Sequence, residues 1–396
     1  MTPDPQIQQK LSYNFDYPVA FTEDVFDPEN PLLARTLDRL DENRVHRAMV
    51  FIDSSVADLL PQITQHIIQY FDAYSDDIEL AEEPRVIPGG EIIKNDIEVV
   101  GPLISAMVDA HLCRHSFAII IGGGAVLDTV GFAAALTHLG IRTVRIPTSL
   151  FAQINAGLGV KTGINFDNRK NCAGVFAPPF AVINDWQFLY SLPEREWLGG
   201  VAEAFRLALL FDPEFFDELC SLASTLSQRR SEDIQHIVQR GASITLARIA
   251  AQNDPFESTP GNPLDFALWA AHKLEMLSQC EISHGEAVAV GVLLDSLYAV
   301  EQGWFPEAEF ERLSTAFSQL GLPFWFAELD LVGDDGNPEI FHGIPDFQEH
   351  KGGMLCIPFP SGIGSVRIEH LIDLSVMEQA LQRLKTLAAS GVELHH

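Results

Sequence analysis

The sequence predicts a parallel α/β domain followed by a mostly helical domain, and three observations lead to this fold class. The first is an apolar run at 117–121, a glycine turn at 122–124, helical spacing over 125–139 and a second strand predicted at 142–147. This order is typical of a βαβ unit, whose two strands run parallel. The second is a series of helical patterns after Pro193 with no strand pattern between them. The third is the length, because 396 residues, of which 47% are hydrophobic, suffice for two domains.

The other elements of the α/β domain precede the βαβ unit. Residues 1–44 contain many prolines and acidic residues and are expected to form an arm. Strands are predicted at 47–52 and 86–90, and helices at 57–73 and 96–111. Together with the βαβ unit, these elements predict a Rossmann-like, nucleotide-binding domain over 45–188.

Helices dominate the second domain, which is expected over residues 189–396. They are predicted at 194–210, 213–226, 231–252, 264–279, 284–302, 306–320 and 374–389. Residues 330–347 are rich in Asp, Gly and Pro and are expected to form a surface loop, whereas 355–359 favours a short strand. The chain is therefore assigned to the α/β + α class, with a domain boundary near residue 188.

The glycine turn at 122–124 is the first candidate for ligand binding. A turn between a strand and a helix brings backbone N–H groups and a helix N-terminus to a phosphate. Its pattern is G-G-G-x-x-x-D rather than the spaced G-x-G-x-x-G, so a tight turn without a ligand remains an alternative. Lys161 and Lys170 follow in sequence typical of loops, and they favour an anionic substrate.

Composition argues against some classes of partner. The formal net charge of −30 argues against a nucleic-acid backbone or an anionic membrane, although a few local lysines can still bind a phosphorylated substrate. The five cysteines are scattered without a C-x-x-C pair, which favours free thiols in a reducing cytoplasm. No signal peptide is expected at the N-terminus. Because the apolar stretch 117–136 contains Asp128 and glycines, a buried core is expected there rather than a membrane span.

A set of ordered motifs carries a family resemblance. The motifs are GGGAVLD, IPTSLFAQINAGLGVKT, RKN, APPFAVIND, SLPERE and GVAEAF, followed by HGEAVAVGV from His284. In this combination they resemble the sugar phosphate cyclases, whose best-known member is 3-dehydroquinate synthase. KNCAGVFAPPFAVIND and NPLDFALWAAHKLE resemble most closely the 3-dehydroquinate synthase-like proteins of ebo-type gene clusters. The resemblance covers about residues 45–370 and implies a dehydroquinate synthase-like fold and a homodimer.

The resemblance also implies NAD as a cofactor. The positions that match residues around NAD in the family are Asp53, Glu91, Lys94, Gly123, Gly124, Asp128, Thr148, Ser149, Lys161 and Lys170. Alternatives remain for some of them. Asp53 can simply end a strand, and Glu91 and Lys94 can form a solvated pair on a helix.

A divalent metal, Zn or Co, is the second implied cofactor. Glu203 lies in an otherwise apolar helix, where a carboxylate needs a partner or a metal, and it matches one of three family ligands. His284 matches another. The third position is Leu268, which cannot bind a metal, and an open zinc site normally needs three protein ligands. His272 lies one helical turn later on the same face and is either a replacement ligand or an ordinary half-buried histidine.

Several predicted catalytic positions are altered relative to the family. Lys161, Lys170, Asn171 and His272 are retained, and the resemblance implies that Lys161 and Asn171 hold a phosphate while Lys170 lies near the nicotinamide. Asn155 stands where the family has Asp. Arg206 stands where a Lys is usual, and Arg cannot shuttle protons. Leu139 and Asn262 replace arginines.

The implied activity is an NAD-dependent cyclisation of a seven-carbon sugar phosphate with elimination of phosphate. Two alternatives remain. A polyol or iron-type alcohol dehydrogenase shares the two-domain plan, and a non-catalytic homologue would keep the fold and NAD without turnover. Because Leu268 removes a ligand, weak or absent metal in the purified protein and little or no turnover on common seven-carbon sugar phosphates are expected.

Overall fold

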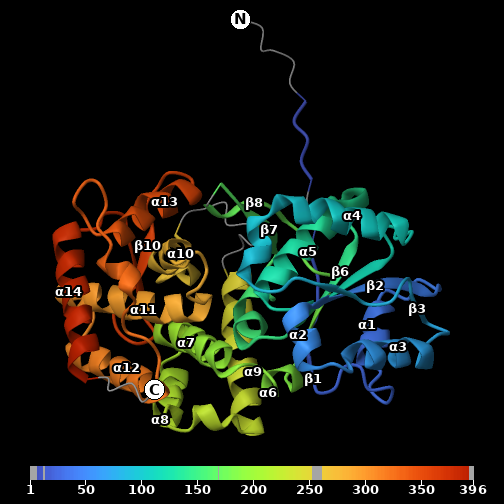
Figure 1. The fold of residues 1–396 in the computed structure, drawn as a ribbon, viewed down its shortest axis with the longest axis horizontal. Coiled ribbons are helices and arrows are strands. Elements are labelled where there is room, and N and C mark those ends of the chain that lie inside the picture. The colour runs from blue at the N-terminus through green and yellow to red at the C-terminus, as the bar shows by residue number, and fades with distance from the viewer. Residues whose placement is uncertain (1–6, 12–13, 168, 252–260, 392–396) are drawn as a thin grey trace, which may run out of the picture.

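The structure is a computed structural model that describes residues 7–11, 14–167, 169–251 and 261–391. Figure 1 shows two halves side by side, an α/β half coloured blue to green and a helical half coloured mainly yellow-green to red. The predicted fold class, a parallel α/β part followed by a mostly helical part, is confirmed. The boundary near residue 188 remains a proposal. The last strand of the sheet ends at Asp185, and the first long helix of the second half begins at Glu194.

A seven-stranded sheet forms the centre of the α/β half. Its strands are β1 (Val19–Thr22), β2 (His46–Asp53), β3 (Ile78–Leu80), β4 (Arg85–Ile87), β5 (Phe117–Gly122), β6 (Arg142–Pro147) and β9 (Ala181–Asp185). The order is β1-β9-β6-β5-β2-β3, with β4 also paired to β2, and every pairing is parallel. The expected arm therefore contributes a strand, β1, which pairs with β9 at one end of the sheet.

Alternation along β2 explains why both faces of the sheet are covered. Val50 and Ile52 belong to one apolar cluster, whereas Met49 and Phe51 belong to another on the opposite face. The covering helices are α1 (Leu32–Leu37), α2 (Ser54–Leu59), α3 (Ile63–Ala73), α4 (Val100–Asp109), α5 (Gly124–Leu136) and α6 (Gln187–Tyr190). The single helix predicted at 57–73 is wrong, because the chain leaves helical geometry at Leu60 between α2 and α3.

The region of Lys161 and Lys170 is an antiparallel hairpin, not the predicted loops. It consists of β7 (Lys161–Phe166) and β8 (Arg169–Phe176), and Ile164 is buried beside α5. Glycines interrupt the apolar alternation by which a strand is predicted from sequence. The pairing of β7 with β8 nevertheless depends on them. A Cβ at Gly163 would lie 2.6 Å from the carbonyl oxygen of Ala173. Lys161 is the first residue of β7, and Lys170 lies in β8 beside a register shift of the pairing.

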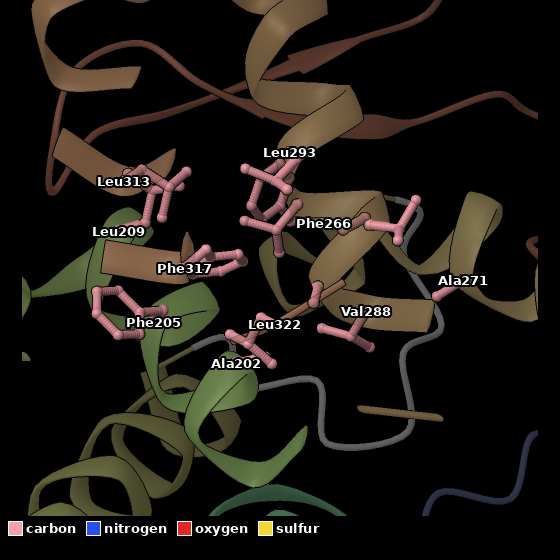
Figure 2. Close-up of a cluster of buried hydrophobic side chains, with 14 of the residues drawn as sticks. Ala202, Phe205, Leu209, Phe266, Ala271, Val288, Leu293, Leu313, Phe317 and Leu322 are labelled. Atoms are coloured by element: carbon pink, nitrogen blue, oxygen red, sulfur yellow. The ribbon is translucent and has the colours of Figure 1, made fainter. Parts of the chain in front are cut away.

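The helical half is built around two crossing helices, α7 (Glu194–Phe211) and α11 (His284–Glu301). Their backbones nearly touch, because a Cβ on Gly285 would lie 2.2 Å from the Cα of Gly199. Figure 2 shows the apolar cluster beside this crossing, with Phe205 of α7, Val288 of α11 and Phe317 among the labelled side chains. The other elements are α8 (Pro213–Leu222), α9 (Ser231–Ala251), α10 (Leu268–Leu277), α12 (Glu307–Leu320), α13 (Gly343–His350), α14 (Leu374–Gly391) and a ribbon of β10 (Ile357–Pro360) and β11 (Val366–Glu369).

Two predictions for this half need correction. The helix expected from residue 264 begins at Leu268, because Ala267 adopts a left-handed conformation with φ of 66° directly before it. Part of the loop expected at 330–347 is helical, since α13 begins at Gly343. The later start of α10 matters for the site, because it places Leu268 in the first turn of that helix.

Candidate active site

A cavity of about 600 Å³ is lined by residues of both halves of the molecule. Its wall combines the carboxyl ends of sheet strands, where α/β proteins bind ligands, with parts of α10 and α11. The predicted site residues that line it are Asp53, Glu91, Lys94, Gly123, Gly124, Asp128, Thr148, Ser149, Asn155, Lys161, Lys170, Asn171, Leu268, His272 and His284. Glu203 and Arg206 do not line it.

The glycine turn and the end of β2 form one edge of this cavity. The turn needs glycine, because a Cβ at Gly122 would lie 2.9 Å from the Val126 side chain. Asp53 ends β2 and also lines the cavity, while its carboxylate accepts a hydrogen bond from the Ser55 backbone N–H at 2.9 Å. Burial raises the pKa of Asp53, and hydrogen bonds from Ser55 and Gly123 oppose that rise.

A buried lysine network forms the next part of the wall. Lys94 is 3% exposed, so it is not part of a solvated surface pair. Its ammonium donates to Asp128 Oδ2 at 2.7 Å and to the side-chain oxygen of Asn171. Burial would lower the pKa of Lys94, but the carboxylates of Asp128 and Glu91 outweigh it and hold the pKa above its usual value. This network connects strand β8 of the hairpin, through Asn171, with the short 3-10 helix that carries Lys94 and with helix α5, which carries Asp128.

Lys170 connects the hairpin to the helical half. Its ammonium lies 2.6 and 2.5 Å from the two carboxylate oxygens of Glu275 and 3.6 Å from Glu91 Oε1. His284 Nδ1 lies 2.9 Å from Glu275 Oε2. Burial would raise the pKa of Glu275, but the charge of Lys170 and contact with His284 hold it well below its usual value. Burial and the charge of Lys170 hold the pKa of His272 well below its usual value.

Glu203 and Arg206 form a separate buried ion pair behind the cavity wall. Arg206 Nε donates to Glu203 Oε2 and a second guanidinium nitrogen to Glu203 Oε1, both at 2.7 Å. The remaining nitrogen donates to the backbone oxygens of Leu264 and Phe266. Asn155, which does line the cavity, donates to Glu203 Oε1 at 2.7 Å. The partner that Glu203 was expected to need is therefore an arginine.

The residues present do not fit a zinc ion at the predicted family position. Leu268 offers no donor atom, and both carboxylate oxygens of Glu203 are held by Arg206. Of the three predicted positions, His284 alone presents a donor atom to the cavity. Arg206, predicted at a catalytic position, likewise lies away from the cavity, because its donors all point to Glu203 and to two carbonyls.

Glu275 and Lys351 are among the cavity residues that sequence reasoning missed. Glu275 is 1% exposed and stands three residues after His272, a spacing that places both on one helix face. That spacing was visible in the motif NPLDFALWAAHKLE. Lys351 also lines the cavity and contacts Asp265 at 2.8 Å. The sequence feature that could have indicated Lys351 is the position of this cation directly before Gly352 and Gly353.

Fold and site together define a protein with a parallel α/β half and a helical half, a glycine turn at the end of a strand, and a cavity whose wall carries both lysines and carboxylates. Residues 85–199 match the 3-dehydroquinate synthase N-terminal family, and residues 200–333 match its C-terminal counterpart. The 3-dehydroquinate synthase of Geobacter sp. (strain M21) is 35% identical over 295 residues, covering 74% of this chain and 79% of the relative. The chain belongs to the 3-dehydroquinate synthase family of sugar phosphate cyclases.

Two further relatives are cyclases with another product. The 2-epi-5-epi-valiolone synthase of an Actinoplanes sp. strain is 28% identical over 396 residues, covering 98% of this chain and 95% of the relative. The solved structure of ValA, a 2-epi-5-epi-valiolone synthase from Streptomyces hygroscopicus subsp. jinggangensis, has NAD+ and Zn2+ bound. It is 28% identical, covers 96% of this chain and 100% of its own, and has a TM-score of 0.85.

Within the described residues, no helix combines the length and the apolar character that a membrane crossing needs.

Proposed function

We propose that the protein is an NAD-dependent cyclase that converts a seven-carbon sugar phosphate into a carbocycle with release of inorganic phosphate. The observation that carries the proposal is the convergence on one cavity of the glycine turn and Asp128 with Lys161, Lys170 and His284. Hydride, phosphate and proton chemistry on one substrate need such convergence. Family membership supports the reaction class, and the relatives named above differ in product.

The edge of the cavity at the glycine turn suits NAD. Backbone N–H groups at the start of α5 can meet a pyrophosphate, and the carboxylate of Asp53 at the end of β2 can meet a ribose. NAD bound there supplies reversible acceptance of a hydride from a hydroxyl-bearing carbon of the substrate. ValA, the relative with TM-score 0.85, holds NAD+.

The chain's own residues hold the substrate and move its protons. Lys161 lines the cavity and, with Asn171, can orient the phosphate by charge-assisted hydrogen bonds. Lys170 and His284 share Glu275, so this trio can hold a substrate hydroxyl and carry its proton. His272 lies in the same wall, and burial and the charge of Lys170 hold its pKa well below the usual value.

The overall reaction is redox-neutral. Removal of hydride from a hydroxyl-bearing carbon acidifies the neighbouring C–H bond, and loss of that proton expels phosphate as its C–O bond breaks. Return of the hydride restores the alcohol, after which ring opening and an intramolecular aldol step close the carbocycle. No step is assigned to a metal at the predicted family position, because Leu268 and the Glu203–Arg206 pair do not fit one.

Phosphate release with NAD present is expected when purified protein meets the seven-carbon sugar phosphate that is its substrate, whereas common seven-carbon sugar phosphates are expected to give little or no release. NADH should not accumulate, since the hydride returns to the substrate. The variant Lys161→Met should lower the rate at limiting substrate by about tenfold or more, because a charge-assisted contact to phosphate is lost. Inorganic phosphate and absorbance of NADH report the two quantities.

Two other outcomes would contradict the cyclase proposal. Accumulation of NADH in step with product would indicate an alcohol dehydrogenase. NAD binding without phosphate release on every seven-carbon sugar phosphate would indicate a non-catalytic homologue. The observations that favour this second candidate are Leu268 in the cavity wall and the burial of Glu203 behind it.

NAD affinity is expected to fall in the variant Asp128→Asn. Asp128 lines the cavity and accepts a hydrogen bond from the Lys94 ammonium. Loss of the Asp128 charge therefore removes the carboxylate that neutralises Lys94 at the edge of the cavity that faces the cofactor. The expected loss is about 1–3 kcal/mol of binding free energy. Calorimetric titration of NAD measures it, with Asp109→Asn, an exposed position on α4, as the matched control. Failure of the folded wild-type protein to bind NAD would refute the assignment.

We also propose a homodimer in the cytoplasm. Family resemblance supports the dimer, and the five cysteines, all of them free, suit a reducing compartment. Light scattering of the purified protein measures the oligomeric state, and a monomer at micromolar concentration would contradict the dimer.

A further inference from the structure

We infer that His272, Glu275 and His284 form a divalent-metal site, displaced by one helical turn from the position that the resemblance predicts. One ligand atom from each residue lies within 4.8 Å of the other two. All three side chains line the cavity. The inference does not depend on the cyclase proposal, because metal binding is measured without substrate or NAD.

Two elements hold the three donors in place. His272 and Glu275 are three residues apart on α10 and therefore share a face. His284 is the first residue of α11, whose start is fixed by a capping box in which Ser283 and Glu286 bond each other's backbone N–H. The two imidazole rings lie 5.9 Å apart with planes 32° from parallel, so both can turn a nitrogen toward one ion.

The donor set suits Zn2+ or Co2+. Two imidazoles and one carboxylate are a known catalytic zinc set, which leaves a fourth position open for water or substrate. The cavity provides that open side. The ring of Phe151 packs against His284, with the two ring centroids 4.5 Å apart. Within the described residues the His272 ring makes contact with His284 but has no hydrogen-bond partner, so its nitrogens are available.

Lys170 is the competitor for this site. Its ammonium lies 2.6 and 2.5 Å from the Glu275 oxygens and 3.4 Å from His284 Nδ1, so it occupies the side on which an ion would bind. A metal must displace it, and Glu91 Oε1, 3.6 Å from the ammonium, offers the displaced lysine a second partner. Lys170 therefore weakens metal binding without removing a ligand.

Titration of metal-free full-length protein tests the site. Co2+ is followed by its visible absorption and Zn2+ by calorimetry, with neither substrate nor NAD present. The expected result is one ion per chain, with affinity reduced at least about tenfold in Glu275→Gln and in His272→Gln. Lys170→Met should bind more tightly than wild type. His350→Gln and Leu268→Ala, two other cavity positions, should match wild type.

Three results would overturn the inference. They are no binding by the folded wild-type protein, wild-type affinity in His272→Gln, and loss of binding in Glu203→Gln with retention in His272→Gln. The last would place the ion at the predicted family position. If Glu275→Gln does not fold, His272→Gln carries the test, because His272 lacks the ion pair that Glu275 makes. A failed cyclase assay leaves these outcomes unchanged.

Discussion

Replacing Arg206 with methionine is expected to lower the free energy of unfolding by about 3–5 kcal/mol. Arg206 and Glu203 are 1% and 0% exposed, and the variant would leave the Glu203 carboxylate buried with only the amide of Asn155 to stabilise it. Two carbonyls, of Leu264 and Phe266, would lose their donor as well. Urea unfolding followed by circular dichroism measures the change.

A double variant separates the ion pair from its packing. Glu203→Leu combined with Arg206→Met removes both buried charges and should recover much of the lost stability, because a well-packed apolar pair can replace a buried ion pair. Arg114→Met, at an exposed position, is the control and should change little. A loss below about 1 kcal/mol in Arg206→Met would mean that the pair is not formed in solution.

The free energy of unfolding should fall as the pH rises from about 5 to 8, because one buried carboxyl group keeps its proton in the folded state. Asp295 on α11 is 0% exposed and accepts hydrogen bonds from the Trp269 indole at 3.0 Å and the Ala267 backbone at 3.2 Å. Burial raises its pKa to about 8. The folded state therefore keeps a proton that the unfolded chain loses above its ordinary pKa of about 3.9.

This difference fixes the sign of the pH effect. Stability from protonated Asp295 is fully present below about pH 4 and is lost as the pH approaches 8, with a slope of up to about 1.4 kcal/mol per pH unit. The variant Asp295→Asn has no such proton, so its unfolding free energy should depend less on pH. Denaturant titrations at pH 5, 6.5 and 8, with Asp109→Asn as the control, compare the slopes. Parallel curves for wild type and Asp295→Asn would contradict a raised pKa.

Strong local patterns made the main architecture predictable. The βαβ unit around β5 and β6 has an apolar run in β5, a glycine turn and a long helical pattern, so its type and order could be predicted. The β7–β8 hairpin was not predictable in this way, because its glycines and asparagines are also typical of loops. Strand β1 was hidden for a related reason. Its four residues pair with β9, about 160 positions later, and no local signal reports such pairing.

The candidate site shows the same division. The order of the motifs predicted four site residues that do line one cavity, namely Asp128, Lys161, Lys170 and His284. The partners that decide their chemistry are long-range. Lys170 meets Glu275 across 105 residues, and Asn155 meets Glu203 across 48. Arg206 was different, since its three-residue spacing from Glu203 is a helical ion-pair signal that could have predicted the buried pair.

The hydrogen bonds from Arg206 to the Leu264 and Phe266 carbonyls also determine how this wall of the cavity depends on the supply of metal. They connect α7 to the segment that leads into α10. Both partners in each of these hydrogen bonds are protein atoms, so the connection needs no metal ion. A cell short of zinc, or a buffer containing a chelator, removes nothing from it. The wall that carries His272 is therefore assembled during folding, whatever the metal supply, and an ion that arrives later meets helices already in position.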